Sequence, residues 1–309
     1  MSRLDVVTGA FSYTGRFVAP RLIARGRRLR TLTNHPDPPS RLSSQCEVWP
    51  LDFERPEQLC ESLRGADTLY NTYWVRSTSG VARFDQAVRN SGLLLEAAKR
   101  AGVRRVVHIS IANPTDSDTP YYRGKARVEE LVRASGLAYA IGRPTLLFGH
   151  GDVLINNIVW FLRRVPIFGI PGDGRYRLQP VHIEDFADRI VDAGLSQENL
   201  IFDVAGPEIF TFEELVRTLI HAIGRRVLAL HVPAGIAVAA ASMASVAVGE
   251  AVLTRAELDA LMADLLVSRQ PSTCPTRFTD WVQANHGSLG LTFASETLRR
   301  QRSQARSRT

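Results

Sequence analysis

The chain has 309 residues, of which 45% are hydrophobic and 22% charged, proportions that exclude a disordered or fibrous protein and are typical of a globular one. The formal net charge is +7 (38 basic residues less 31 acidic ones), but residues 299–309 hold five arginines and no acid, so the rest of the chain is close to +2. Because the excess charge is confined to this basic tail, and no zinc-finger, helix-turn-helix or RNA-binding signature is present, we expect no nucleic-acid partner.

The three cysteines are Cys46, Cys60 and Cys274, and no two of them form a C-x-x-C pair. Scattered cysteines in an odd number indicate a reducing compartment and argue against a zinc site, so we expect no bound metal. Residues 2–7 run directly into a strand-like segment without the ordered regions of a signal peptide. We therefore expect a cytoplasmic protein.

The first half of the chain alternates short apolar runs with helical patterns. Strand-like runs occupy residues 4–8, 29–33, 47–51, 68–72 and 105–110, and helical stretches occupy residues 15–25, 55–64 and 81–101. This alternation predicts right-handed βαβ units, and continuous apolar runs are typical of parallel strands that are buried on both faces. The predicted fold is α/β, a doubly wound parallel sheet of the Rossmann type.

After a further strand at residues 137–141 the pattern loosens. Loops rich in Gly and Pro follow at 148–152, 166–174 and 205–208, and helices are predicted at 212–223 and 233–267. We predict a Rossmann core at residues 1–150 with sheet contributions from about 176–206, a smaller interleaved substrate-facing portion with C-terminal helices at 151–298, and the basic tail at 299–309.

Residues 232–249 contain no charged side chain but are rich in Ala, Gly and Ser. A membrane span needs about 20 strongly apolar residues, so no integral span is expected here. We expect a buried helix or a helix at a subunit contact, with a homodimer as one alternative.

A glycine loop follows the first strand, running from Gly9 through Ser12, Tyr13 and Thr14 to Gly15. At a tight strand–helix turn, unpaired backbone N–H groups and the helix dipole bind pyrophosphate. An ordinary βα loop is the alternative. Ser12 stands where the middle glycine usually falls, and its hydroxyl is expected to add a phosphate contact.

The choice of dinucleotide depends on the end of the second strand. Proteins that bind NAD place an acid there to hold the ribose 2′-hydroxyl, but residues 31–35 read TLTNH. Thr33 and Asn34 would not repel a 2′-phosphate, and Arg16 is within reach of one, so NADP(H) is favoured over NAD(H). Asp52 and Phe53 end the third strand. Asp52 is expected either to hold the adenine amine or to cap the next helix.

Tyr121 and Lys125 form a Y-x-x-x-K pair at the start of a helical stretch. At this spacing both side chains share one helix face, and the ammonium lowers the phenol pKa from about 10 so that the tyrosine can exchange a proton. A surface pair is the alternative. The chain has only two lysines, Lys99 and Lys125, among 38 basic residues, which favours a specific role for the one beside Tyr121.

Two further segments follow in order, Arg143-Pro144-Thr145 with Phe148-Gly149, and residues 180–187 (PVHIEDFA). With the glycine loop and the Tyr121/Lys125 pair, they make residues 3–220 resemble the extended and atypical short-chain dehydrogenases/reductases, the NAD-dependent epimerase/dehydratase group. The loop and segment 71–74 are most similar to the atypical subgroup that includes the NADPH-binding accessory subunit of respiratory complex I.

The resemblance implies a role for several residues. It implies that Tyr13 and Thr14 meet the pyrophosphate, that Thr72 and Tyr73 line the cofactor groove, and that Pro144 lies by the nicotinamide. It also implies a catalytic Ser or Thr after the fifth strand, for which Ser110 is the nearest candidate. Tyr121 follows Ser110 by only eleven positions, a short gap for an active epimerase.

Two functional hypotheses follow. The first is an NADP(H)-dependent oxidoreductase or epimerase acting on a small carbonyl or sugar-like substrate, in which Tyr121 is the acid/base, Lys125 its activator and Ser110 the group that polarises the carbonyl. The second is a non-catalytic NAD(P)(H)-binding protein with a structural or sensory role. The intact Tyr121/Lys125 pair favours the enzyme, and the short gap between Ser110 and Tyr121 favours the alternative.

Overall fold

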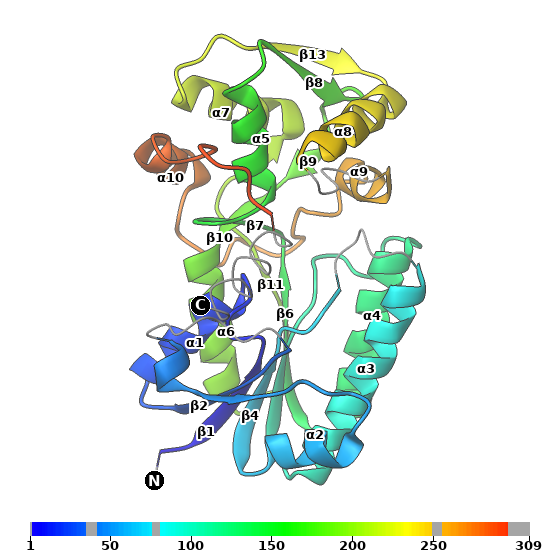
Figure 1. Cartoon of the computed structure of the whole chain (residues 1–309), viewed down its shortest axis with the longest axis vertical. Coiled ribbons are helices and arrows are strands. Elements are labelled where there is room, and N and C mark those ends of the chain that lie inside the picture. The colour runs from blue at the N-terminus through cyan, green and yellow to red at the C-terminus, as the bar shows by residue number, and fades with distance from the viewer. Residues whose placement is uncertain (1, 35–41, 76–80, 249–254, 296–309) are drawn as a thin grey trace. The chain divides into compact units, whose positions relative to one another are not determined.

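The computed structural model describes residues 2–34, 42–75, 81–248 and 255–295 (Figure 1). The basic tail predicted at 299–309 lies outside these residues. The chain divides into two compact units. The first is built mainly from Met1–Pro144 and Phe186–Phe202, and the second from Thr145–Asp185 and Asp203–Arg299.

A seven-stranded sheet forms the centre of the first unit, with the strand order β11-β6-β5-β4-β1-β2-β3. The register runs parallel through the neighbouring pairs from β3 to β6. This confirms the predicted doubly wound fold. The strands are β1 (Leu4–Thr8), β2 (Arg28–Leu32), β3 (Glu47–Trp49), β4 (Ala66–Asn71), β5 (Arg105–Ile109), β6 (Ala138–Pro144) and β11 (Leu200–Val204).

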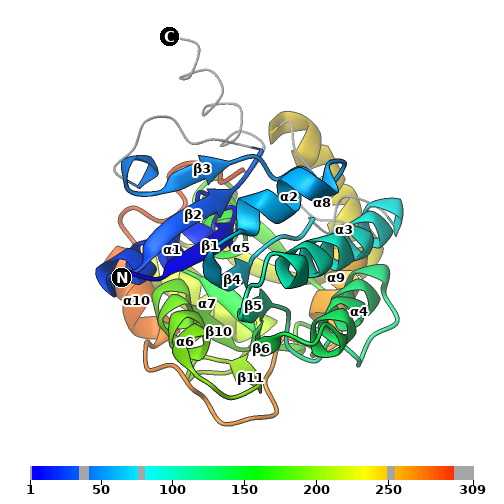
Figure 2. The same cartoon turned by 90° about the horizontal axis from the view of Figure 1, so that it is seen from below.

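Helices cover both faces of this sheet, as Figure 2 shows, with α1 and α6 on one face and α2, α3 and α4 on the other. Ion pairs of 2.6 Å from Arg21 to Asp188 and from Arg25 to Asp192 join α1 to α6. On the other face, buried aliphatic side chains of the strands and of α2, α3 and α4 form one continuous core. The helical segments are α1 (Gly15–Ala24), η1 (Ser43–Gln45), α2 (Pro56–Leu63), α3 (Val81–Arg100), α4 (Pro120–Ala134) and α6 (Ile183–Leu195).

In its described residues, the second unit packs five helices and three two-stranded sheets around its own apolar core, which includes Phe148, Phe212 and Phe278. The sheets pair β10 with β7, β12 with β9 and β13 with β8. Their strands are β7 (Leu146–Phe148), β8 (Ile167–Pro171), β9 (Arg177–Leu178), β10 (Pro180–His182), β12 (Phe210–Thr211) and β13 (Leu228–Val232). The helices are α5 (Leu154–Leu162), α7 (Phe212–Ala222), α8 (Ala234–Val248), α9 (Arg255–Met262) and α10 (Phe278–Asn285).

The single helix predicted over 233–267 is wrong. Two helices, α8 and α9, lie in this range, and residues 249–254 between them are outside the described part. The chain leaves the helical conformation after α9, where Asp264 adopts a φ of 58°.

The charge-free α8 has no buried residue among those whose side chains are described, and Ile236 and Met243 are 57% and 72% exposed. Of the two expected alternatives, the buried helix is therefore wrong, and the subunit contact stays a prediction. No helix in the described ranges is both long and apolar enough to cross a membrane.

Candidate cofactor-binding and active site

The glycine loop connects β1 to α1 through a turn that two glycines make possible. Gly9 adopts a φ of +72° and donates its N–H to the Leu32 carbonyl over 2.8 Å. A Cβ on Gly15 would lie 2.1 Å from the Gly9 carbonyl oxygen, so no larger residue fits there. The Ser12 hydroxyl accepts a hydrogen bond of 3.2 Å from the Gly15 N–H. Ser12 thus closes the loop from inside, a role that the sequence did not indicate.

The start of α1 is suited to an anion. Thr14 is the N-cap residue but makes no side-chain capping bond, and the first turn carries no acid. The Arg16 guanidinium lies 5.1 Å from the ring centroids of both Tyr13 and Phe17, which hold it beside the loop. Helix dipole and guanidinium therefore favour negative charge at the same place, as pyrophosphate binding requires.

The end of β2 is tied to the segment after β3. The Asn34 amide donates to the Leu51 carbonyl over 2.6 Å and accepts from the Leu51 N–H over 3.1 Å. Thr33 donates its N–H to the Trp49 carbonyl over 2.9 Å. The Asn34 amide thus bonds to the backbone of Leu51. The preference for NADP(H) at this position therefore depends on Arg16 and on the absence of an acidic residue at the end of β2. Residues 35–41 lie outside the described part.

Asp52 is not the N-cap of the next helix, which was one of its two expected roles. The N-cap of α2 is Arg55, and the Asp52 carboxylate instead accepts from the Glu54 N–H over 2.9 Å and pairs with Arg55 at 3.4 Å. The side chain of Asp52 remains 30% exposed. A contact to an adenine amine therefore stays a prediction.

An aromatic pair stands where β3 and β4 end. The rings of Phe53 and Tyr73 lie 4.9 Å apart, and the Tyr73 hydroxyl accepts from the Asn90 amide over 2.8 Å. Thr72 and Tyr73 both donate their N–H to the Thr8 hydroxyl, over 2.8 and 3.0 Å, and the Thr72 hydroxyl donates to the Thr8 carbonyl. The ends of β1 and β4 are thereby fixed side by side, and the rings of Phe53 and Tyr73 are tilted by 54° to each other.

Lys125 lies on α4 with its side chain buried. Its ammonium donates to the Ile109 carbonyl over 3.0 Å and lies 4.6 Å from the centroid of the Trp74 ring. Burial lowers the pKa of this ammonium to about 7, although the Glu129 carboxylate one turn later acts in the opposite direction. Glu129 is itself held by Arg143, whose Nε donates to it over 2.9 Å.

Ser110 follows β5 directly and is 4% exposed. Its hydroxyl has no hydrogen-bond partner among the described residues, and the carbonyl of its neighbour Ile109 holds Lys125. Pro144 ends β6, and its carbonyl accepts from the Ala112 N–H over 2.9 Å. The fold therefore brings Ser110, Lys125 and Pro144 to the carboxyl edge of neighbouring strands.

Tyr121 lies one turn before Lys125 on α4 and is half-buried. Its ring meets those of Trp74 and Phe84 edge-on, at centroid distances of 6.1 and 5.8 Å. Trp74 thus receives the Lys125 ammonium on its face and the edge of Tyr121. A Cβ on Gly124 would lie 2.9 Å from the Trp74 ring, so this glycine inside a helix makes room for the indole.

The sequence indicated no role for Trp74 or for the buried His108 beside the site. The one signal for Trp74 was Gly124, a glycine inside a helical pattern. His108 Nδ1 lies 3.3 Å from the Asn71 amide, and burial lowers the pKa of His108 to about 3. His108 Nε2 and Trp74 Nε1 are buried without a partner in the described part of the chain. Together with the Ser110 hydroxyl, these atoms can accept or donate bonds to a bound molecule.

The residues present fit a nicotinamide dinucleotide. The glycine loop offers a helix N-terminus for the pyrophosphate, Phe53 and Tyr73 an apolar surface for the adenine end, and Lys125 and Ser110 polar groups for the nicotinamide end. No group of three or more metal-ligating side chains occurs within the described ranges.

Comparison with known proteins supports this assignment. The sequence family described as NAD(P)H-binding matches residues 9–152. A ceramide reductase of Caulobacter vibrioides is 27% identical over 74% of this chain and 73% of its own length. An Arabidopsis thaliana complex I subunit, NADH dehydrogenase [ubiquinone] 1 alpha subcomplex subunit 9, is 26% identical over 69% of this chain but only 56% of that protein. A 4-hydroxy-2-methyl-3-oxo-4-farnesyl-3,4-dihydroquinoline-1-oxide ketoreductase of Stigmatella aurantiaca is 25% identical over 59% of this chain and 61% of its own.

Solved structures agree on the fold. The Citrobacter triphenylmethane reductase complexed with NADP(H) superposes with a TM-score of 0.73 at 19% identity, over 92% of this chain and 99% of that one. The UDP-N-acetylglucosamine 4-epimerase of Bacillus cereus gives 0.68 at 17% identity, over 94% and 98%. The chain is an NAD(P)(H)-binding protein with the fold of the atypical short-chain dehydrogenases/reductases and the epimerase/dehydratase group. More particularly, it is a distant homologue of the subunit 9 (40 kDa) proteins of complex I.

Proposed function

We propose that the protein is an NADP(H)-dependent oxidoreductase acting on a carbonyl compound. The observation that carries the proposal is the Lys125 ammonium, buried and with its pKa lowered to about 7, one helical turn from Tyr121 and bonded to the residue before Ser110. A lysine placed in this way is costly for the fold, and strongly perturbed groups gather at functional sites.

The chain's own residues would handle the proton. The Tyr121 phenol donates its proton to the carbonyl oxygen, and the Ser110 hydroxyl donates a hydrogen bond to the same oxygen. The Lys125 ammonium stabilises the phenolate that forms when Tyr121 gives up its proton. When bound, a nicotinamide dinucleotide would supply the hydride that reduces the carbonyl carbon to an alcohol, and its oxidised form would accept a hydride in the reverse reaction.

Two of the relatives named above are a reductase and a ketoreductase, and their names give hydrophobic substrates, a ceramide and a farnesylated compound. A substrate screen should therefore begin with lipid-like ketones and aldehydes, followed by nucleotide sugars to include epimerisation. The preference for NADP(H), the homodimer and the cytoplasmic location belong to the same proposal, the last supported by Cys46, Cys60 and Cys274, none of which lies in a disulfide within the described residues.

A non-catalytic dinucleotide-binding protein is the second candidate. The contact of the Lys125 ammonium with the Trp74 ring favours it, because this indole covers the group that would assist Tyr121. The complex I relatives, which are named as subunits, are consistent with it.

The deciding experiment compares the wild type with Tyr121→Phe. Cofactor absorbance is followed during the substrate screen, and cofactor affinity is measured by calorimetry with NADPH and NADH. We expect Tyr121→Phe to keep its affinity for NADPH and to lose about 10²–10⁴-fold in turnover, the usual contribution of a general acid/base. Turnover of a substrate by Tyr121→Phe at the wild-type rate would refute the mechanism. Tenfold tighter binding of NADH than of NADPH would refute the cofactor assignment. NADPH binding without turnover across the screen would favour the second candidate.

A further inference from the structure

An arginine-lined cavity opens in the first unit at the edge where β1, β2 and β4 begin. Its volume is about 560 Å³, within the range typical of small-molecule sites. The glycine loop follows the opposite, carboxyl end of β1, so this cavity is separate from the cofactor residues. Its charged lining consists of one carboxylate and five arginines: Asp67 with Arg3, Arg28, Arg30, Arg64 and Arg104.

On one side of the cavity, Asp67 is shared by three arginines. Arg27, Arg104 and Arg3 approach its carboxylate at 2.7, 3.0 and 3.6 Å. Arg27 also pairs with Asp5 at 2.5 Å. Three guanidinium groups therefore face two carboxylates, an excess of one positive charge. Burial raises the pKa of Asp5, and the hydrogen bond from Arg27 acts in the opposite direction.

On the other side, Glu47 is shared by two arginines. Arg28 and Arg30 approach it at 2.8 and 2.7 Å. Arg30 is further fixed by the Ser62 carbonyl at 2.8 Å and lies 4.9 Å from the centroid of the Trp49 ring. Two guanidinium groups face one carboxylate on this side, which leaves a second excess positive charge.

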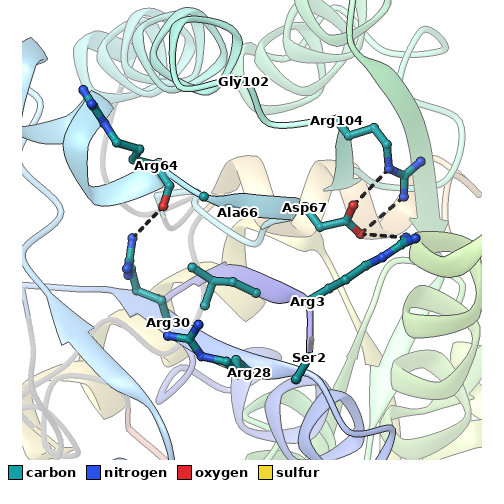
Figure 3. A pocket seen from close by; sticks show the side chains of 11 residues that line it. Ser2, Arg3, Arg28, Arg30, Arg64, Ala66, Asp67, Gly102 and Arg104 are labelled. Carbon is teal, nitrogen blue, oxygen red and sulfur yellow. Dashed lines mark hydrogen bonds and ion pairs between the residues drawn. The ribbon is translucent and has the colours of Figure 1, made fainter.

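Arg64 adds no excess, because it pairs with Glu61 at 2.9 Å. Its backbone carbonyl accepts from Arg30 over 3.3 Å, and Figure 3 shows its guanidinium turned away from the other arginines. In the same view Arg28 and Arg30 stand on one side of the cavity, with Arg3 and Arg104 on the other. Among the described residues, six arginines of this set meet four carboxylates, an excess of two positive charges beside one cavity.

We propose that this cavity binds a dianionic, phosphate-bearing small molecule. Guanidinium groups match phosphate oxygens with paired hydrogen bonds, and arginine is the residue favoured for such recognition. Arg30 is held rigidly by Glu47 and by the Ser62 carbonyl and supplies a fixed positive charge to the wall of the cavity. The side chains of Arg3 and Arg28 are each 61% exposed, so they can reorient onto a ligand at little cost. The proposal does not depend on the carbonyl chemistry.

The test is calorimetric titration of the full chain, saturated with NADPH, with inorganic phosphate and with glycerol phosphate, each at constant ionic strength set by chloride. The double variant Arg28→Gln/Arg104→Gln removes both excess charges and leaves Glu47 and Asp67 paired with Arg30 and Arg27. We expect at least a tenfold loss of phosphate affinity, with Arg28→Lys intermediate. Tighter binding of the monoester than of inorganic phosphate would identify a metabolite as the ligand, and the reverse order would identify free phosphate.

The matched control is Arg100→Gln/Arg127→Gln, which lowers the net charge equally at two exposed arginines outside the cavity, paired with Glu57 and Glu130. It should bind phosphate as the wild type does. The proposal is overturned if phosphate produces no more heat than chloride, or if the two double variants lose affinity equally. Circular dichroism of each variant shows whether the fold is intact, and Arg28→Lys retains a testable charge if the double variant does not fold.

Discussion

Replacing Lys125 with methionine is expected to stabilise the cofactor-free protein near neutral pH. Lys125 is buried, and burial lowers the pKa of its ammonium to about 7. The unfolded chain carries an ordinary lysine with a pKa of about 10.4. Between these two values the unfolded state binds the extra proton, so the stability of the wild type rises with pH there and is lowest below pH 7.

The size of the effect follows from the difference of more than three pH units. At about 1.4 kcal/mol for each unit, burying the charged side chain costs about 4–5 kcal/mol below pH 7. Methionine avoids this cost but leaves the Ile109 carbonyl without its donor, which costs about 1–3 kcal/mol. We therefore expect Lys125→Met to be more stable than the wild type by about 2 kcal/mol at pH 6, with the advantage gone by pH 9.

The assay is urea unfolding of the wild type and Lys125→Met at several pH values from 6 to 9.5, with equal m-values required of both. Lys99→Met is the control, because Lys99 is the only other lysine and is exposed. Its stability difference from the wild type should stay near zero at every pH. If the difference in the free energy of unfolding between Lys125→Met and the wild type is independent of pH, the lowered pKa of the buried Lys125 ammonium is refuted.

Three further outcomes are expected. Gly15→Ala places a Cβ 2.1 Å from the Gly9 carbonyl oxygen and should weaken NADPH binding at least tenfold in calorimetry; unchanged affinity would show that the loop does not hold the cofactor. Burial lowers the pKa of His108 to about 3, so wild-type stability should fall by about 1.4 kcal/mol per pH unit as the pH drops below 6.5. Urea unfolding of His108→Gln should lack that slope, and an equal slope in both proteins would contradict the assignment. Glu129→Gln leaves Arg143 half-buried without its carboxylate and should destabilise the protein by about 3 kcal/mol in the same assay, whereas Glu130→Gln, at an exposed pair, should change little.

The sequence by itself determined the Rossmann sheet and the position of the glycine loop after its first strand. Strand and helix periods are local, and the β-branched residues of the short run at residues 4–8 favour a strand, all five residues of which are buried in β1. Gly9 and Gly15 could be found in the same way, because a tight strand–helix turn restricts which residues fit within a few positions of one another. After residue 144 the periodicity of apolar residues is weak, so fewer elements could be predicted there. The predicted long helix at 233–267 was wrong for that reason.

Only the tertiary structure decided how side chains from distant segments are used. Asn34 bonds to the backbone of Leu51, Trp74 packs against Gly124 and the Lys125 ammonium, and the arginine cavity gathers residues from Arg3 to Arg104. None of these pairings leaves a periodic pattern, because each depends on which strands are neighbours and in what register. The order of β4, β1 and β2 in the sheet brings their first residues together, and with them the charges that a linear sequence shows only as scattered arginines.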